Sequence, residues 1–200
     1  MTNVQSLVAE FDAVLGKASI ARGTAILRQV IDLFLEGATS YSGDQIAVFG
    51  LVTNLLVGKV ERQALIELSG RLASADNAPA DVVNRLSRDD DIAIAGPILK
   101  TSKALSDGDI LEIAEAKGHA HLLAIACRNV LNEGTTDVLT NRGTPEVLRK
   151  VADNESARFS EIGYVKLITQ AQHDKALAKS IANRKDIPAE LQSFLQMSLA

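Results

Sequence analysis

The sequence predicts an all-α protein in which helical hairpins stack into a short, curved α-solenoid. Aromatic residues make up only 4% of the chain and Trp is absent, which favours helices packed through small and aliphatic side chains. No stretch alternates cleanly between polar and apolar residues. Instead, Gly, Pro and Ser or Asp recur about every 10 to 20 residues, and the segments between them carry apolar residues at spacings of three and four.

Composition sets limits on size, location and partners. A chain of 200 residues with 46% hydrophobic content can bury a sizeable core. A net charge of −4 argues against a protein that mainly binds phosphate backbones, so nucleic acid is not an expected partner. One Cys and no recognisable secretion signal predict a cytoplasmic location. The near-apolar run from Ile46 to Gly58 is too short to span a bilayer, so we expect a buried core helix and no membrane insertion.

Two regions are expected along the chain. Residues 1–60 are predicted to form three longer helices, at about 3–15, 19–36 and 42–57, that pack on the rest of the molecule. Residues 61–200 are predicted to form shorter helices in pairs, which gives about a dozen helices in one continuous domain. The N-terminal helices are also a candidate interface for a homodimer.

Polar residues mark the starts of several helices. Ser42 with Gln45 has the pattern of a capping box, in which each side chain accepts a hydrogen bond from a free backbone N–H group. Ser106 and Asp174 open two later helices in the same manner. Glycines are expected just after the ends of helices. The predicted C-caps are Gly118 and Gly143.

An ungapped internal repeat determines the expected architecture. Arg71–Leu86 (RLASADNAPADVVNRL) aligns with Ser180–Leu195 (SIANRKDIPAELQSFL), and weaker copies contain Ile125 and Val151. In each unit a helix ends in an aliphatic residue followed by Ala. In the two strong copies, Pro and then an acidic residue start the next helix. Because one hairpin cannot bury its apolar face alone, neighbouring hairpins are expected to stack.

Two stretches, DDDIAIAGPILKTSKALSDGDILEIA and RFSEIGYVKLI, lie within a span of about residues 40–196 that resembles a known family. This is an uncharacterised bacterial family, a domain of unknown function found mostly in alphaproteobacteria. Its helical repeats are similar to HEAT, armadillo and leucine-rich-repeat-variant units. The resemblance implies a short right-handed α-solenoid of HEAT-like helical hairpins. It implies no activity, because the family has none assigned.

Lys117–Asn129 (KGHAHLLAIACRN) holds two of the three His residues and the only Cys. His119 and His121 are two residues apart on a predicted helix, so they point to nearly opposite sides and cannot chelate one ion. Cys127 is expected to be a small buried core residue, and a catalytic Cys–His pair would need His173. His121 remains a candidate phosphoacceptor, although the apolar residues that follow it favour a structural role.

Two acidic stretches carry the oxygen ligands that Mg²⁺ or Ca²⁺ prefers. Asp89 to Asp91 are explained more simply as the start of a helix, whose positive end favours carboxylates. Asp107 and Asp109 lack the third ligand, the glycine and the closing Glu of a calcium loop. The sequence also lacks phosphate-loop, dinucleotide-binding and nucleophile-elbow motifs. We therefore expect no catalytic, metal or cofactor site, and no enzyme.

The repeat places four residues at one shared offset: Ala75, Arg128, Asn154 and Arg184. In a stacked array they would lie in a row, and the row would offer donors to an acidic partner or a phosphate. Alternatively, Arg128 and Arg184 bond the last carbonyl groups of their own helices. The candidate partner-binding residues are Arg128, Asn154, Arg184 and His121.

The leading hypothesis is a non-catalytic interaction or regulatory scaffold module that binds an unidentified protein, because stacked repeats create extended surfaces. One alternative is a HEAT-like nucleic-acid-binding protein, which would need a basic channel and, to hold an extruded base, exposed aromatic residues. The other is a phosphorelay or signalling component that uses His121.

Overall fold

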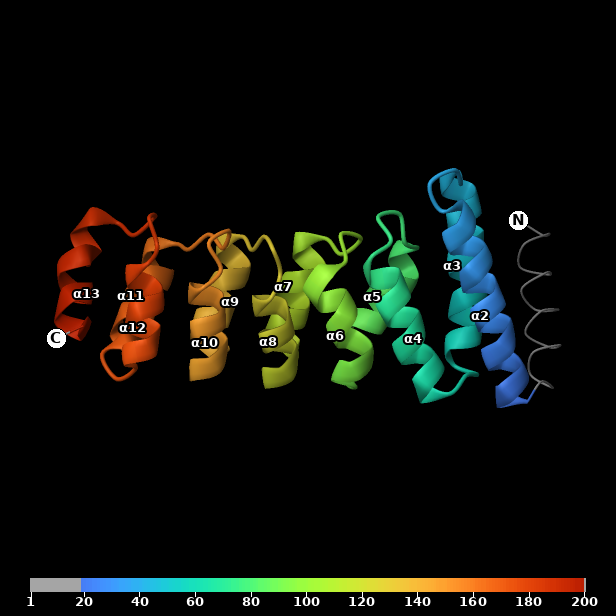
Figure 1. The fold of residues 1–200 in the computed structure, drawn as a ribbon, viewed down its shortest axis with the longest axis horizontal. Helices are drawn as coiled ribbons and strands as arrows, with labels where there is room; N and C mark the ends of the chain where they lie inside the picture. Colours follow the sequence, from blue (N-terminus) through green and yellow to red (C-terminus); the bar gives the residue numbers. More distant parts are fainter. Residues whose placement is uncertain (1–18, 200) are drawn as a thin grey trace.

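The computed structural model describes residues 19–199, which form twelve α-helices and one 3₁₀ turn (Figure 1). The all-α prediction is therefore confirmed for this part of the chain, whereas the helix predicted at 3–15 lies outside the described residues. The helices are α2 (Ile20–Gly37), α3 (Gly43–Val57), α4 (Arg62–Ala73), α5 (Ala80–Ser87), α6 (Ile92–Thr101), α7 (Asp107–Ala116), α8 (His119–Ala126), α9 (Glu133–Arg142), α10 (Pro145–Ala152), α11 (Glu161–Ala171), α12 (Lys175–Ala182) and α13 (Gln192–Leu199).

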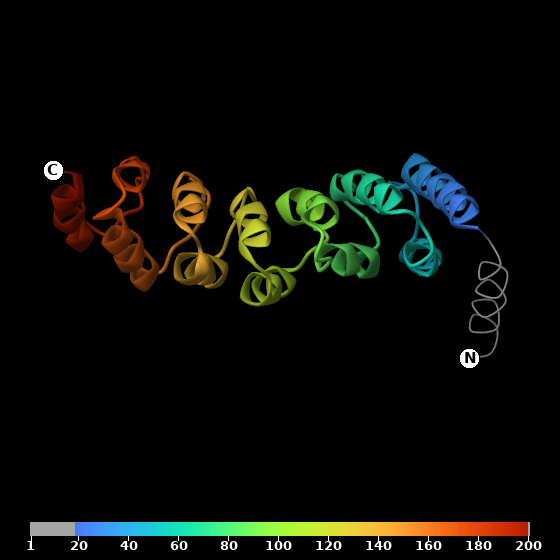
Figure 2. The ribbon, with the colours of Figure 1, turned by 90° about the horizontal axis from the view of Figure 1, so that it is seen from below.

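The helices lie in two layers. The even-numbered helices pack side by side in one layer, and the odd-numbered helices form the other (Figure 2). Consecutive helices such as α5 and α6, or α11 and α12, pack against each other and connect the layers, as expected for helical hairpins. The hairpins follow one another along an elongated row, with α2 and α3 at one end and α13 at the other (Figure 1).

The core runs along this row, at positions that the repeat predicts. The aliphatic residue of each repeat is fully buried, and in α4, α8, α10 and α12 it is the next-to-last residue of the helix. Burying a Leu, Ile or Val side chain contributes roughly 1.5–3 kcal/mol. Stacking therefore buries one equivalent side chain per hairpin. These residues are Leu72, Ile125, Val151 and Ile181.

The predicted helix starts are confirmed. Ser42 and Gln45 form a capping box at α3, Ser106 caps α7, and Asp174 caps α12 through Oδ1, which accepts from two backbone N–H groups. Of the two predicted C-caps, Gly143 is confirmed at the end of α9. Gly118 is instead the N-cap of α8, because α7 ends at Ala116 with Lys117 as its C-cap and the next helix starts at once.

The predicted buried core helix over Ile46–Gly58 is only half correct. It is α3, but Val48 is 61% exposed and Leu51 is 39% exposed. The physical reason is its place at the end of the odd-numbered layer. Among residues 19–199, α5 is its neighbour in that layer, and nothing flanks it on the other side. None of the helices in the same range is long and apolar enough to cross a membrane.

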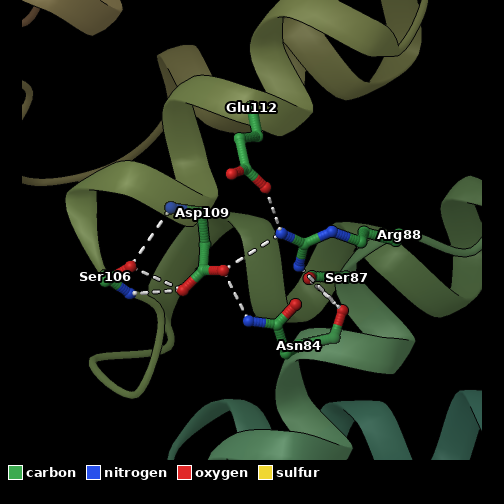
Figure 3. A network of polar contacts seen from close by, with 6 residues as sticks. All are labelled: Asn84, Ser87, Arg88, Ser106, Asp109 and Glu112. Atoms are coloured by element: carbon green, nitrogen blue, oxygen red, sulfur yellow. Dashed lines mark hydrogen bonds and ion pairs between the residues drawn. The ribbon is translucent and has the colours of Figure 1, made fainter.

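A polar network joins α5 to α7 (Figure 3). Asp109 Oδ1 accepts hydrogen bonds from Asn84 Nδ2 at 2.5 Å and from Arg88 Nη2 at 3.0 Å. Its other oxygen accepts from the Ser106 hydroxyl at 2.6 Å. Arg88 also pairs with Glu112 at 2.9 Å. One carboxylate thus closes the first turn of α7 and holds the neighbouring hairpin.

The network makes stability depend on pH. The hydrogen bond from the Ser106 hydroxyl lowers the pKa of Asp109 to about 2. Burial acts in the opposite direction, and the bonds from Asn84 and Arg88 lower the pKa further. Because the pKa is lower in the folded state, the stabilisation is complete above the unfolded value of about 3.9 and is lost as pH falls through about 2. We expect Asp109→Asn to lower the free energy of unfolding by about 2 kcal/mol at pH 7, and by less as pH falls from about 4 to 2. Urea unfolding across this range measures the difference, with Asp107→Asn as control. A difference that stays constant with pH would contradict the assignment.

Candidate functional site

The predicted row of polar residues exists, and it joins one hairpin to the next. Arg128 follows α8, and its guanidinium donates to Leu99 O at 2.7 Å and to Ser102 O at 2.8 Å, at the end of α6. Asn154 follows α10, and its Nδ2 donates to Arg128 O at 2.6 Å. Arg184 follows α12 and continues the pattern back to the end of α10. We call Arg128, Asn154 and Arg184 the ladder.

The alternative that Arg128 and Arg184 bond carbonyl groups of their own helices is wrong. The carbonyl oxygens that accept from their side chains belong to the preceding even-numbered helix and the residues after it. Carbonyls at their own helix ends are already used, because the backbone N–H groups of Arg128 and Arg184 donate to Ile125 O and Ile181 O. Neighbouring helix axes lie about 8–10 Å apart, a distance that a long Arg side chain can bridge.

Ala75, the first predicted member of the row, has no side-chain donor. The corresponding bond comes from Asn77, two residues later, whose Nδ2 donates to Ala38 O at the end of α2. The same kind of contact thus recurs at the N-terminal end of the row with a different residue. This side chain lies outside the shared offset, so the repeat alignment does not find it.

Arg184 has the most bonds in the ladder. Although only 9% exposed, it donates to Ala152 O at 3.2 Å and to Ala157 O at 2.7 Å, and pairs with Asp186 at 2.9 Å. Its Nε also lies 3.0 Å from Tyr164 Oη. Burial, and then the bond to Asp186, raises the pKa of Tyr164 to about 12. Burial opposes ionisation of Asp186 too, but Arg184 holds its pKa below the ordinary value. The cluster is fixed in one charge state at neutral pH.

The fourth candidate, His121, is not part of the ladder and does not line the groove beside it. Its side chain is 6% exposed, and Nε2 lies 2.8 Å from Asp89 O, so it links α8 to the residues before α6. His119 contacts Thr144 and Glu146 instead. The two histidines thus face different neighbours, as expected from their spacing. Cys127 was expected to be buried, but it is partly exposed because it caps the C-terminal end of α8.

The acidic stretch at Asp89–Asp91 starts α6, as predicted. Asp91 Oδ1 accepts from the Ala93 N–H group at 3.0 Å, and the other Asp91 oxygen pairs with Arg62. Asp90 pairs with Lys117 at 2.5 Å. Across residues 19–199, no three His, Cys, Asp or Glu side chains converge as a metal-binding group.

Two hollows lie along the ladder and share Ser156 as a lining residue. Their volumes are about 270 Å³ and 470 Å³. Arg128 and Asn154 line the first hollow, and Arg184 lines the second, so three of the four predicted site residues meet here. We call the two hollows the ladder groove. Its other lining residues are Ala126, Cys127, Asn129, Val130, Lys150, Asp153, Glu155, Ser156, Arg158, Asn183, Lys185 and Asp186.

The groove is more basic than the chain as a whole. Five cationic and three acidic side chains line it, whereas the whole chain carries a net charge of −4. The guanidinium groups of Arg128 and Arg184 donate to carbonyl oxygens inside the molecule. By contrast, Lys150, Arg158 and Lys185 are exposed and form no ion pair with any residue from 19 to 199. The sequence analysis did not identify these three cations as candidates, because each occupies a different offset in its repeat.

The comparisons with known proteins identify a family. Residues 94–198, slightly more than half of the chain, match DUF2336, which is described as an uncharacterised protein conserved in bacteria. The match starts later than the expected span, which began near residue 40. No curated protein and no solved structure matches the chain. The matched segment contains the whole ladder groove and most of the stacked hairpins. The chain therefore belongs to the DUF2336 family of uncharacterised bacterial proteins.

Proposed function

We propose that this protein is a non-catalytic scaffold or regulatory module, an α-solenoid of HEAT-like hairpins that binds another protein through the ladder groove. The observation that carries the proposal is that the cations of the groove fall into two groups with different contacts. Arg128 and Arg184 face inward and hold the hairpins together. Lys150, Arg158 and Lys185 line the same groove, and no carboxylate within the described chain neutralises them.

The chemistry of the groove favours binding over catalysis. Cys127 lines it, but none of its lining residues is a His that could act as a base toward that thiol. Two of its lining residues, Arg184 and Asp186, are held together by two hydrogen bonds. Such a surface offers fixed charge and hydrogen-bond donors, which suit recognition of a partner.

The two alternatives receive less support from the geometry. A phosphorelay through His121 needs an accessible imidazole nitrogen, but this side chain is buried and its Nε2 contacts Asp89 O. Holding an extruded base needs accessible aromatic faces. Phe159 and Tyr164 are buried, pack against each other with ring centroids 5.2 Å apart, and flank Arg184.

The N-terminal region belongs to the same proposal. Helices α2 and α3 continue the two layers, so we treat the described part of residues 1–60 as packed on the repeats and continuous with them. The exposed apolar side chains of α3, Val48 and Leu51, form the surface that a homodimer would use. A terminal hairpin of a stacked array otherwise carries a polar outer face.

Affinity capture tests the proposed function. A lysate of the cells that carry this gene is passed over immobilised wild-type protein, Lys150→Glu/Lys185→Glu, and Lys166→Glu as a matched control. Lys166 lies on α11 in the other layer and contacts Asn141. We expect one protein to be retained by wild type and control, and to be reduced at least about tenfold by the double variant, a loss of about 1.4 kcal/mol or more.

The same proteins retained by all three, or no protein enriched by wild type, would refute the groove as a protein-binding site. Circular dichroism and urea unfolding of each variant show that the fold is kept. Exposed Lys150 and Lys185 make no bond to the rest of the described chain, so these substitutions leave the ladder in place.

A further inference from the structure

We infer that the ladder groove receives an extended acidic segment of the partner protein, in which one apolar residue stands among the acidic ones. This inference rests on the proposed function and names the chemistry of its partner. Three properties of the groove carry it: its unpaired cations, an exposed valine beside them, and its length.

The first property is charge. Of the three acidic side chains in the groove, Asp186 is committed to Arg184 at 2.9 Å, which leaves Asp153 and Glu155. Against them stand Lys150, Arg158 and Lys185, all exposed. The positive surface continues along α12, where exposed Lys175 and Lys179 share a helix face with Asn183 of the groove.

These two lysines also form no ion pair with residues 19–199. Three unpaired cations of the groove, with Lys175 and Lys179 farther along α12, therefore outnumber its two unpaired carboxylates in a protein whose overall charge is negative. Complementary charge speeds encounter and suppresses wrong partners, so the fitting ligand is acidic. The two carboxylates disfavour a uniformly anionic polymer and favour a short segment whose acidic residues meet the lysines.

The second property is an exposed apolar side chain. Val130 follows α8, lines the larger hollow and is 71% exposed. Its neighbours in that hollow include Arg158 and Lys185. Covering apolar surface is favourable by about 25 cal/mol per Å². A partner that places one aliphatic side chain against Val130, between acidic residues, satisfies both kinds of surface at once.

The third property is length. The groove follows the ends of α8, α10 and α12, which are neighbours in one layer. Two helix-to-helix steps of about 8–10 Å each give a path of about 20 Å. An extended chain rises about 3.3 Å per residue, so about six residues span it. This is the length of a short linear segment and not of a folded domain.

Fluorescence anisotropy with three labelled ten-residue peptides tests the inference. The first has Glu and Asp around a central Leu, the second replaces that Leu with Ser, and the third replaces the acidic residues with Lys. Single-stranded oligothymidine of ten nucleotides is the fourth probe. We expect the first peptide to bind wild type and Lys166→Glu equally, to bind Lys150→Glu/Lys185→Glu at least tenfold more weakly, and to weaken as salt rises. Val130→Ser should remove the advantage of Leu over Ser.

Several outcomes overturn the inference. They are failure of the acidic Leu peptide to bind wild type, equal binding to the double variant, or oligothymidine binding as tightly as the peptide. The two proposals fail separately. If the peptide fails but capture from lysate still depends on Lys150 and Lys185, the groove binds a protein of other chemistry, and only the acidic segment is refuted. If both fail, the proposed function falls as well.

Discussion

Replacing Arg184 with Ala is expected to lower the free energy of unfolding by about 3–5 kcal/mol, because several buried acceptors lose their donor at about 1–3 kcal/mol each. Arg184 is 9% exposed, and its guanidinium donates to carbonyl oxygens that follow α10, to Tyr164 and to Asp186. Alanine removes the donor to the buried carbonyl oxygens of Ala152 and Ala157, and Asp186 loses its counter-charge. The loss also removes the contact of the cation with the Phe159 ring, at 4.7 Å.

Urea unfolding followed by circular dichroism measures this loss, with two controls chosen from the same cluster. Tyr164→Phe removes the hydroxyl that bonds Arg184 and Asp186 and should cost about 1–2 kcal/mol. Lys185→Ala changes an exposed neighbour and should stay within about 0.5 kcal/mol of wild type. A variant Arg184→Ala no less stable than Tyr164→Phe would show that the guanidinium does not hold α12 to α10.

The stability effect decides how function must be tested. A double change of Arg128 and Arg184 to Glu would place two acidic groups beside buried carbonyl oxygens, and loss of binding would then report unfolding. Lys150 and Lys185 line the same groove without taking part in the ladder. Substituting them separates recognition from stability.

Local patterns in the sequence were sufficient for much of the fold. The repeat predicted which aliphatic residues end the even-numbered helices, because one buried position per hairpin recurs at a fixed offset. Ser42, Ser106 and Asp174 were identified as helix starts because capping involves residues only three positions apart. Such features need no knowledge of the neighbouring hairpin.

Features that depend on neighbours were not predictable. The offset showed that Arg128 and Arg184 share a row, but not that each donates to a helix end 26 to 32 residues earlier in the chain. The exposed face of α3 likewise follows from its terminal place in the layer, which its apolar sequence does not reveal. The cations Lys150, Arg158 and Lys185 meet only after stacking.

Arg128→Met is expected to lower the free energy of unfolding by about 2 kcal/mol, the range for hydrogen bonds that involve a charged group. The guanidinium of Arg128 donates to Leu99 O and Ser102 O. Burial lowers the pKa of Arg128, and the negative charge of Asp107 partly offsets this shift. Unlike Arg184, it has no carboxylate paired with it among residues 19–199, so no counter-charge is left unpaired. The expected loss is therefore smaller than for Arg184→Ala.

Urea unfolding measures the total effect, and hydrogen exchange of the Ser102 amide, which bonds Ile98 O, reports where it acts. Arg128→Lys is the matched control: it keeps the charge but cannot reach two carbonyl oxygens with the planar fork of Arg, so about half of the loss should remain. Since each hairpin of a stacked array contacts only its neighbours, exchange should rise near α6 and α8 and stay unchanged in α12. Uniform destabilisation along the row would show that the stack unfolds as one unit, with the ladder acting on all hairpins together.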